Sequence, residues 1–451
     1  MASQNPVPEF KAVTCLLVLT FAVGITGCEP DKTPPAGVRS PAEVSSPAEE
    51  LSDHEISNLI DKVNASGTIT DEQAESLSTV EILKLNGLTS ITNEQAESLI
   101  QDDLTFKGVQ ELHLNGLTSI TDVQAESLGR VKMLHLNGLT SITNEQAESL
   151  IIGDQYGDGL ELNGLTSITN VQAESLGKIH DLWLNGLTSI NDEQAKGLAD
   201  SANNLQLNGL ASLTDEQVEI LSNYRAGRVL GLDGLTSISD KQAESLCKVN
   251  GISLNGLMSI TDRQAASLSK DRRLVAVELD GLTSLTDAQA ESLSRVKEYL
   301  TLNGLTSITD KQAESLAKGI RYLELNRLTS ITDKQAESVS KVSAIELNGL
   351  IAITDEQAKL LGKREGYLGL NGLTSINDEQ ARGLASLTVN LQLNSLTSIS
   401  DHQAESLSKV QSLSLNGLTI ITDEQAESLG KVDYLTISEA LQPLIDKYKK
   451  Q

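Results

Sequence analysis

The sequence predicts an α/β solenoid in which a curved parallel sheet lines the concave side and short helices line the convex side. A phrase close to LxLNGLTSITDEQAESLxKV recurs from residue 68 to 437, and fourteen intervals separate Asn86 from Asn416 in its LNGL segment, a mean period of about 24 residues. Each phrase joins alternating Leu residues to a segment of helical spacing. The 451 residues include only 3 Phe, 1 Trp and 7 Tyr, so the core must be built from aliphatic side chains.

The strand and the helix of each unit are visible in one example of the phrase. Leu134 and Leu136 alternate along a short strand and are expected to point inward. Thr143 and Gln146 have the spacing of a capping box at the start of a helix, and Leu150 belongs to the small apolar face of that helix. One unit cannot bury this face alone, so we expect the units to stack into a continuous core.

This combination of Leu-x-x-Leu-x-Leu, Gly-Leu-Thr-Ser-Ile-Thr-Asp and Ala-x-x-Leu resembles the cysteine-containing class of leucine-rich repeats. The chain departs from that class by having Leu where the class has Cys or Asn, as at Leu88, Leu117 and Leu139. The resemblance implies a leucine-rich-repeat solenoid of about 16 units over residues 68–437. We expect residues 51–67 to form an amphipathic capping helix, and residues 438–451 a C-terminal cap, with Ser438 as helix N-cap, and a basic tail.

The first 50 residues predict export and anchoring to a membrane. Residues 12–27 form an apolar run too short for a membrane-spanning helix. The run ends in Ile25-Thr26-Gly27-Cys28, which resembles the lipobox of bacterial lipoprotein signal peptides. The resemblance implies a signal peptide over 1–27, lipidation of Cys28, and a folded part held in the periplasm or at the cell surface. A plain secretory signal, with Cys28 as a bystander, is the alternative.

Residues 28–50 contain five of the eight prolines and few apolar side chains, which is typical of an extended tether. If Cys15 lies in the signal peptide and Cys28 carries lipid, Cys247 has no partner for an intramolecular disulfide. A small buried residue is a better interpretation of Cys247 than a reactive thiol.

Motifs that would indicate catalysis are absent from the sequence. There is no Gly-rich phosphate loop, no HExxH, no CxxC and no Ser elbow between a strand and a helix. The sequence therefore predicts no enzyme and no cofactor. The formal net charge of −27 argues against a nucleic-acid partner, because binding there depends on Lys and Arg that neutralise phosphates.

The outward-facing positions of the strands contain the candidate ligand-binding residues. Nine aromatic residues follow the signal peptide, and five of them fall in two columns, either two or four residues before the LNGL marker. Exposed Tyr and Trp are typical of binding surfaces, although strand propensity alone is the alternative. The five candidates are Trp183, Tyr299, Tyr322, Tyr367 and Tyr434. Three further aromatic residues, in longer units whose insertions could frame such a surface, are Phe106, Tyr156 and Tyr224.

Two histidines and a carboxylate are also expected on neighbouring strands. His113, His135 and Glu161 share one column, and these residue types can hold a transition metal. A solvated surface group is the commoner arrangement, so the sequence predicts no metal ligand. The resulting hypothesis is a lipid-anchored protein whose concave face binds another protein. A glycan or cell-wall ligand, and a structural spacer without a specific ligand, are the two alternatives.

Overall fold

The computed structural model describes residues 51–100, 108–151, 159–199, 203–223, 229–386 and 390–449. The predicted signal peptide, Cys28 and the tether lie outside these residues, as do Phe106, Tyr156 and Tyr224. The chain divides into two compact units, Met1–Lys62 and Val63–Gln451. None of the helices in the described ranges is long and apolar enough to cross a membrane.

The second unit is built from short strands and short helices that alternate along the chain. The strands are β1 Ile82–Lys84, β2 Glu111–His113, β3 Met133–His135, β4 Gly159–Glu161, β5 Asp181–Trp183, β6 Asn204–Gln206, β7 Val229–Gly231, β8 Gly251–Ser253, β9 Ala276–Glu278, β10 Tyr299–Thr301, β11 Tyr322–Glu324, β12 Ala344–Glu346, β13 Tyr367–Gly369, β14 Asn390–Gln392, β15 Ser412–Leu415 and β16 Tyr434–Ile437. The helices, beginning with one that crosses the boundary between the two units, are α2 Asp53–Ser66, α3 Asp71–Leu77, α4 Asn93–Leu99, α5 Asp122–Leu128, α6 Asn144–Ser149, α7 Asn170–Leu176, α8 Asp192–Ala199, α9 Asp215–Ser222, α10 Asp240–Leu246, α11 Asp262–Leu268, α12 Asp287–Leu293, α13 Asp310–Leu316, α14 Asp333–Val339, α15 Asp355–Leu361, α16 Asp378–Leu384, α17 Asp401–Leu407, α18 Asp423–Leu429 and α19 Gln442–Asp446.

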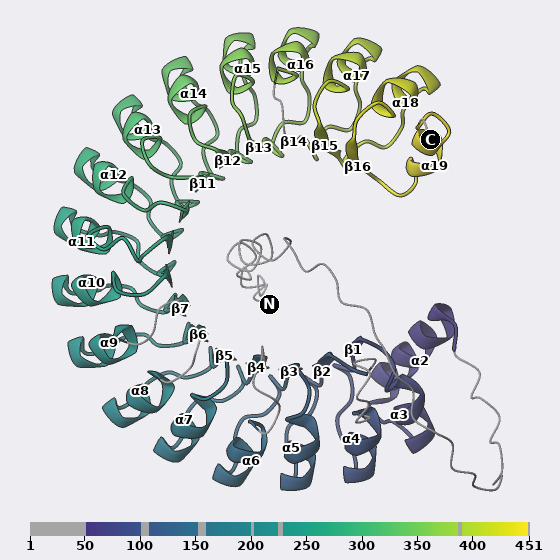
Figure 1. Cartoon of the computed structure of the whole chain (residues 1–451), viewed down its shortest axis with the longest axis vertical. Helices are drawn as coiled ribbons and strands as arrows, with labels where there is room; N and C mark the ends of the chain where they lie inside the picture. The colour runs from purple at the N-terminus through teal and green to yellow at the C-terminus, as the bar shows by residue number, and fades with distance from the viewer. Residues whose placement is uncertain are drawn as a thin grey trace, which may run out of the picture. The chain divides into compact units, whose positions relative to one another are not determined.

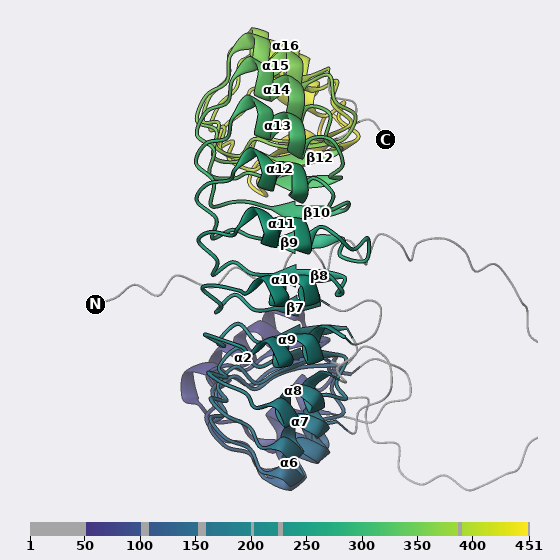
Figure 2. The same ribbon diagram turned by 90° about the vertical axis from the view of Figure 1, so that its left-hand side faces the viewer.

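These strands form one 16-stranded parallel sheet in which each strand pairs with the next one along the chain, from β1 to β16. Within the Val63–Gln451 unit the sheet lines the inner side of an arc and the helices stand on the outer side (Figure 1). Viewed from the outer side, helices α9 to α13 stack as a regular column (Figure 2). The predicted α/β solenoid, with its concave parallel sheet and convex helices, is confirmed.

The core lies between the sheet and the helices and is aliphatic, as the composition predicts. In the first full unit Leu83, Leu85 and Leu88 are completely buried, and Leu99 of the following helix is buried with them. The same positions are filled by Leu, Ile, Val or Ala in the other units. Because each unit buries its apolar face against the units before and after it, the solenoid is stabilised by stacking.

Capping boxes start the helices and also join neighbouring units. At α5 the Thr121 hydroxyl accepts a hydrogen bond from the backbone N–H of Gln124, and the Gln124 side-chain oxygen accepts one from the N–H of Thr121. The remaining Gln124 amide donates to the carbonyl of Ile91 in the preceding unit, at 2.7 Å. The repeated Gln thus satisfies a helix terminus and a loop of the neighbouring unit at once.

The Asn of LNGL forms a continuous ladder along the sheet. The side-chain oxygen of Asn115 accepts the backbone N–H of Asn137 at 2.9 Å, and that of Asn137 accepts the N–H of Asn163 at 2.9 Å. Asp233 replaces Asn in this ladder and accepts from Asn255 in the same way. This column therefore bonds one unit to the next, and its role is structural.

The two ends of the solenoid show how the terminal units are closed. Asn64, in the last turn of α2, donates to the carbonyl of Lys84 at 2.9 Å and accepts the N–H of Gly87 at 2.7 Å, so it continues the Asn ladder beyond the first strand. At the other end the predicted N-cap Ser438 is wrong. Helix α19 starts at Gln442 without a side-chain cap, and Pro443 in its first turn has no N–H that needs a partner. The proposed domain limits within this chain remain predictions.

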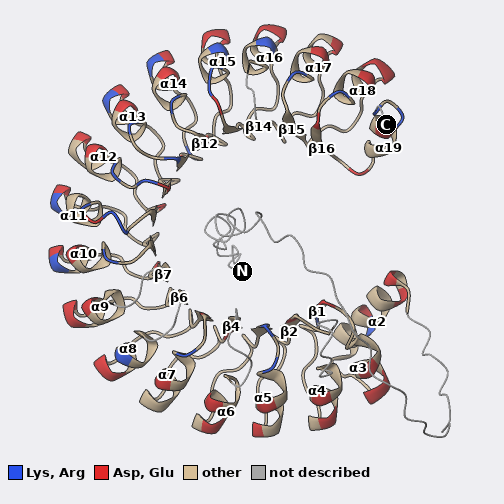
Figure 3. Cartoon of the chain, in the orientation of Figure 1, with Lys and Arg blue, Asp and Glu red and all other residues tan. Residues whose placement is uncertain are grey.

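The acidity of the chain is concentrated on the convex side. Asp and Glu occupy the outer ends of most helices in the Val63–Gln451 unit, and Lys and Arg are fewer (Figure 3). In α18, for example, Asp423 and Glu424 lie in the first turn, where a carboxylate interacts favourably with the helix dipole. The concave sheet carries a different set of charged and aromatic side chains.

Candidate binding surface on the concave sheet

Three of the predicted aromatic residues form one cluster on the concave sheet. Tyr299 on β10 and Tyr322 on β11 are partners in the sheet register, and their rings stack with centroids 5.0 Å apart. Tyr322 also stacks on Tyr367 of β13, at 6.1 Å. The residue between them, on β12, is Ala344, whose small side chain lets the two rings approach. We call Tyr299, Tyr322 and Tyr367, with the carboxylates described next, the tyrosine cluster.

Two glutamates hold the hydroxyls of this cluster. Tyr299 donates to Oε1 of Glu324 at 2.5 Å. Tyr322 and Tyr367 both donate to Oε1 of Glu346, at 2.6 and 3.1 Å. Burial, reinforced by these carboxylates, raises the pKa of all three tyrosines, so the hydroxyls stay protonated and act as donors. The rings are therefore fixed in orientation before any ligand arrives.

A third glutamate extends the acidic part of the surface along the same column. Glu278 on β9 is two strands from Glu324, with Thr301 between them in the register. Burial, with a further contribution from the neighbouring Asp280 carboxylate, raises the pKa of Glu278 to about 8. Burial also raises the pKa of Glu324, although Tyr299 and Asn303 donate hydrogen bonds that oppose this change. Near neutral pH the Glu278 carboxyl group is therefore mostly protonated.

The sheet does not bring all five predicted ligand-binding residues together. Tyr299 is only 5% exposed, while Tyr322 and Tyr367 are half-buried in the cluster. Tyr434 on the last strand is 69% exposed and stands apart. Trp183 on β5 is half-buried beside Glu161 of β4, on a different part of the sheet. Their role in binding stays a prediction, and the cluster is its strongest element.

The two predicted histidines meet in a second polar group, which we call the histidine cluster. His113 on β2 and His135 on β3 stack with ring centroids 3.8 Å apart and planes 6° from parallel. Nε2 of His113 lies 2.6 Å from Oε1 of Glu111, and Nδ1 of His135 lies 2.8 Å from Oε2 of Glu161. Burial lowers the pKa of His113, and its hydrogen bond with Glu111 opposes this change. Glu161 also accepts from Asn137 at 2.8 Å.

The sequence prediction missed Glu111 and the two glutamates of the tyrosine cluster as partners. Glu111 precedes His113 by two residues, so both side chains lie on the same side of β2. Glu324 and Glu346 stand two residues before the LNGL marker, in the same column as His113 and His135. Their hydrogen bonds to tyrosines, which stand four residues before the marker, depend on contacts between neighbouring strands. Alternation within a strand was the signal that could have found Glu111.

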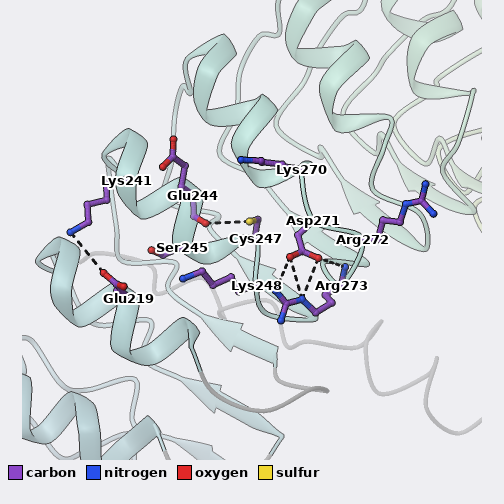
Figure 4. A pocket seen from close by; sticks show the side chains of 10 residues that line it. All are labelled: Glu219, Lys241, Glu244, Ser245, Cys247, Lys248, Lys270, Asp271, Arg272 and Arg273. Atoms are coloured by element: carbon purple, nitrogen blue, oxygen red, sulfur yellow. Dashed lines mark hydrogen bonds and ion pairs between the residues drawn. The ribbon is translucent and has the colours of Figure 1, made fainter.

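A hollow outside the sheet is lined mainly by charged residues and is open to solvent (Figure 4). Four of its charged residues form two ion pairs: Lys241 lies 3.8 Å from Glu219, and Arg273 lies 2.7 Å from Asp271. Cys247 at its wall is buried and donates to the Glu244 carbonyl. Burial raises the pKa of Cys247, which agrees with a filler role and leaves the concave sheet as the candidate site.

The sequence matches no protein-family model and no curated protein. Among solved structures, the chain is similar to a leucine-rich-repeat protein of Leptospira interrogans, with 19% identity, a TM-score of 0.43, and coverage of 82% of this chain and 98% of that chain. It is also similar to the internalin InlF of Listeria monocytogenes, with 14% identity, a TM-score of 0.34, and coverage of 84% and 94%. Likeness at this level concerns the fold alone. The sixteen stacked strand–helix units decide the fold class. The fold is a leucine-rich-repeat solenoid. As in other solenoids, each unit contributes one strand to a continuous concave surface.

Proposed function

We propose that the chain is an exported, lipid-anchored binding protein of the bacterial envelope that holds another protein on its concave sheet without catalysing a reaction. The observation that carries this proposal is the tyrosine cluster. Its half-buried rings and fixed carboxylates form an amphipathic surface on rigid strands, at the residues Tyr322, Tyr367, Glu324 and Glu346. Binding sites placed on strands are held more precisely than sites on loops.

The chemistry of the cluster favours a protein segment that presents Lys or Arg. A cation placed over a tyrosine face is attracted by the ring quadrupole, and Glu346 supplies a carboxylate beside the rings of Tyr322 and Tyr367. Arg in particular can bond a carboxylate and stack on an aromatic ring at the same time. We therefore expect the partner to contribute at least one basic side chain to this surface.

Affinity capture from an envelope extract, with the full chain as bait, tests this function. The double variant Tyr322→Ala/Tyr367→Ala should bind the captured partner at least about 30-fold more weakly, because interface tyrosines often contribute 2 kcal/mol or more. Tyr434→Ala is the matched control, since this tyrosine is exposed and lies outside the cluster. Tyr299 is left unchanged because its buried ring supports the fold.

The outcomes of this experiment separate the proposal from its rivals. If the double variant keeps full affinity for the partner, the concave cluster is not the binding surface. A glycan array forms the second arm, because tyrosine rings also stack on sugars. Glycan binding that is lost in the same variant, without any protein partner, would identify a sugar-binding module. The absence of a ligand in both arms would favour a structural spacer.

The lipid anchor is a separate part of the proposal and rests on the Ile25-Thr26-Gly27-Cys28 motif. Mass spectrometry of the mature N-terminus should show cleavage before Cys28 and the added mass of acyl chains. A Cys28→Ser variant, which keeps the tether but removes the thiol, should leave the membrane fraction, since a stable anchor depends on buried acyl chains. An unmodified Cys28 in the mature chain would contradict the anchor while leaving the binding surface untouched.

A further inference from the structure

The histidine cluster contains donor atoms in the arrangement of a metal site. Oε1 of Glu111, Nε2 of His113 and Nε2 of His135 all lie within 4.8 Å of one another. They come from two adjacent strands, β2 and β3, whose backbones are fixed by the parallel sheet. Zinc is bound by two histidines and one glutamate in a well-known class of three-ligand sites, in which a fourth position stays open.

One of these donor atoms makes no hydrogen bond within the part of the chain that the structure describes. Nε2 of His135 is buried and has no hydrogen-bond partner within the described residues, and the side chain is only 10% exposed. The nearest carboxylate oxygen, Oε1 of Glu111, is 3.6 Å from it, which is too far for a hydrogen bond. A buried ring nitrogen without a partner costs free energy, and this cost is removed when the nitrogen binds a metal ion.

The other nitrogen of His135 is held in the way that metal-binding histidines are held. Nδ1 lies 2.8 Å from Oε2 of Glu161, and Glu161 is itself fixed by a hydrogen bond from Asn137. A carboxylate behind a histidine sets its tautomer and directs the opposite nitrogen toward the metal. Here that opposite nitrogen is the unpartnered Nε2, so Glu161 supports the site from behind.

We propose that Glu111, His113 and His135 bind a divalent transition-metal ion of the zinc class, with Glu161 as the residue that positions His135. Glu111 and Glu161 together carry the charge that balances a divalent cation, and imidazole is a preferred ligand of zinc, copper and nickel. Zinc requires nitrogen donors about 2.0–2.1 Å from the ion, so the three side chains, whose donor atoms lie within 4.8 Å of one another, must close around it. The site lies on β2 to β4, apart from the tyrosine cluster on β10 to β13, and it does not depend on the proposed binding function.

Calorimetric titration of the untagged full chain with Zn²⁺ tests the site. The expected result is one ion per chain with a dissociation constant of about 10 µM or tighter. The double variant His113→Gln/His135→Gln should abolish this binding. Gln suits the fold at these positions, because Gln206 and Gln392 occupy the same column on β6 and β14. His402→Gln, at an exposed position of α17, is the control that should leave the affinity unchanged.

Two further measurements keep the result interpretable. Glu161→Gln should weaken zinc binding by about 10- to 100-fold while leaving the three ligands in place, as expected for a residue that orients a ligand. Co²⁺ in place of Zn²⁺ should give the visible absorption of a four-coordinate ion, and circular dichroism should show that each variant is folded. A dissociation constant weaker than about 1 mM, or equal affinity in the folded double variant, would overturn the proposal and leave a hydrogen-bonded surface group only.

Discussion

At the scale of single residues, the solenoid contains ionisable side chains at partly or fully buried positions where most units have residues that do not ionise. Glu278 shows this on the concave face. It is half-buried beside Asp280, and within the described residues its carboxyl group bonds to Ser253 and Asn255, at 3.2 and 3.4 Å. Such a carboxyl group is held in its neutral form more strongly in the folded protein than in the unfolded chain.

The raised pKa of Glu278 makes stability depend on pH. The pKa is about 8 in the folded protein against an ordinary value of 4.5, so between these pH values the folded state keeps a proton that the unfolded state has lost. The free energy of unfolding therefore falls as pH rises through this window. Glu278→Gln should be more stable than the parent at pH 8, by about 1–3 kcal/mol, and nearly equal at pH 5.

Thermal unfolding followed by circular dichroism at both pH values checks this prediction. Glu405→Gln, at an exposed position of α17, is the control and should change the melting temperature little at either pH. If Glu278→Gln changed the melting temperature by the same amount at pH 5 and at pH 8, ionisation of Glu278 would not be the cause of the stability difference.

Arg364 is a second ionisable residue that lies in the core, where burial disfavours its charged form. It is 3% exposed, its Nη2 donates to the carbonyl of Val342, and its Nε and Nη1 have no hydrogen-bond partner in the described ranges. Burial lowers the pKa of the Arg364 guanidinium to about 10. Arg364 stands between a helix and the next strand, three residues after the buried Leu361. In many other units the corresponding residue is a buried Val, such as Val342.

Arg364→Met should therefore stabilise the protein by about 1–3 kcal/mol, because a flexible apolar side chain of similar length removes a buried charge without opening a large cavity. The melting temperature measured by differential scanning calorimetry should rise. Arg382→Met, which removes an exposed partner of Glu379, is the matched control and should change stability by less than about 0.5 kcal/mol. A lower melting temperature for Arg364→Met would mean that the guanidinium has partners that stabilise it.

At the scale of elements, glycine decides how closely two helices approach. Gly197 in α8 faces the backbone of α7, where a Cβ at this position would lie 2.7 Å from the carbonyl carbon of Ala173 and from the nitrogen of Glu174. Most other helices between α3 and α18 have Ser at the corresponding position, and in several of them it is buried, as at Ser338 in α14. Gly177, which follows α7, faces the carbonyl of Gly197 in turn.

Gly197→Ala should lower the free energy of unfolding, although Ala has a better helix propensity by about 1 kcal/mol. The added methyl group overlaps backbone atoms, and overpacking of this kind costs about 1–3 kcal/mol. Chemical denaturation measures the difference. Ser338→Ala is the control, because it also places Ala at this helix position, in a unit where a Cβ is already accommodated. It should change the free energy of unfolding by less than about 1 kcal/mol. An increase in stability for Gly197→Ala would contradict the close packing.

At the scale of the whole molecule, the dominant feature is a net charge of −27, to which Asp and Glu on the helices contribute (Figure 3). Like charges on neighbouring helices repel and oppose the compact state. Salt screens this repulsion, with a Debye length of about 30 Å at 0.01 M and about 8 Å at 0.15 M. The melting temperature should therefore rise by a few degrees, about 2–5 °C, when NaCl is raised from 0.01 to 0.15 M at pH 7.

The same comparison near pH 4.5, where the formal charges of the chain balance, is the internal control. There the effect of salt on the melting temperature should be much smaller. A decrease at pH 7 would indicate that the cross-unit ion pairs, such as Lys311 with Asp287 at 3.0 Å, outweigh the repulsion.

The repeat by itself determined the fold of this protein. The positions of Leu83 and Leu85, the capping box of Thr121 and Gln124, and the Asn ladder follow from a period of about 24 residues, because each depends only on contacts within a unit or with the next identical unit. The second hydrogen bond of Gln124, to Ile91, was not predicted, since it depends on where the previous loop ends.

Only the tertiary structure decided which outward side chains act together. The columns of the sequence placed His113 beside His135 and the tyrosines on the concave face, but the contact of Glu111 with both histidines, and of Tyr322 with Tyr367 across Ala344, needed the register and curvature of the sheet. The physical reason is the difference in sequence separation between the contacts that make the fold and those that make a site. Fold elements arise from local periodic contacts that the sequence repeats, whereas a site is made where those repeats differ, at distances of a few ångströms across separate strands.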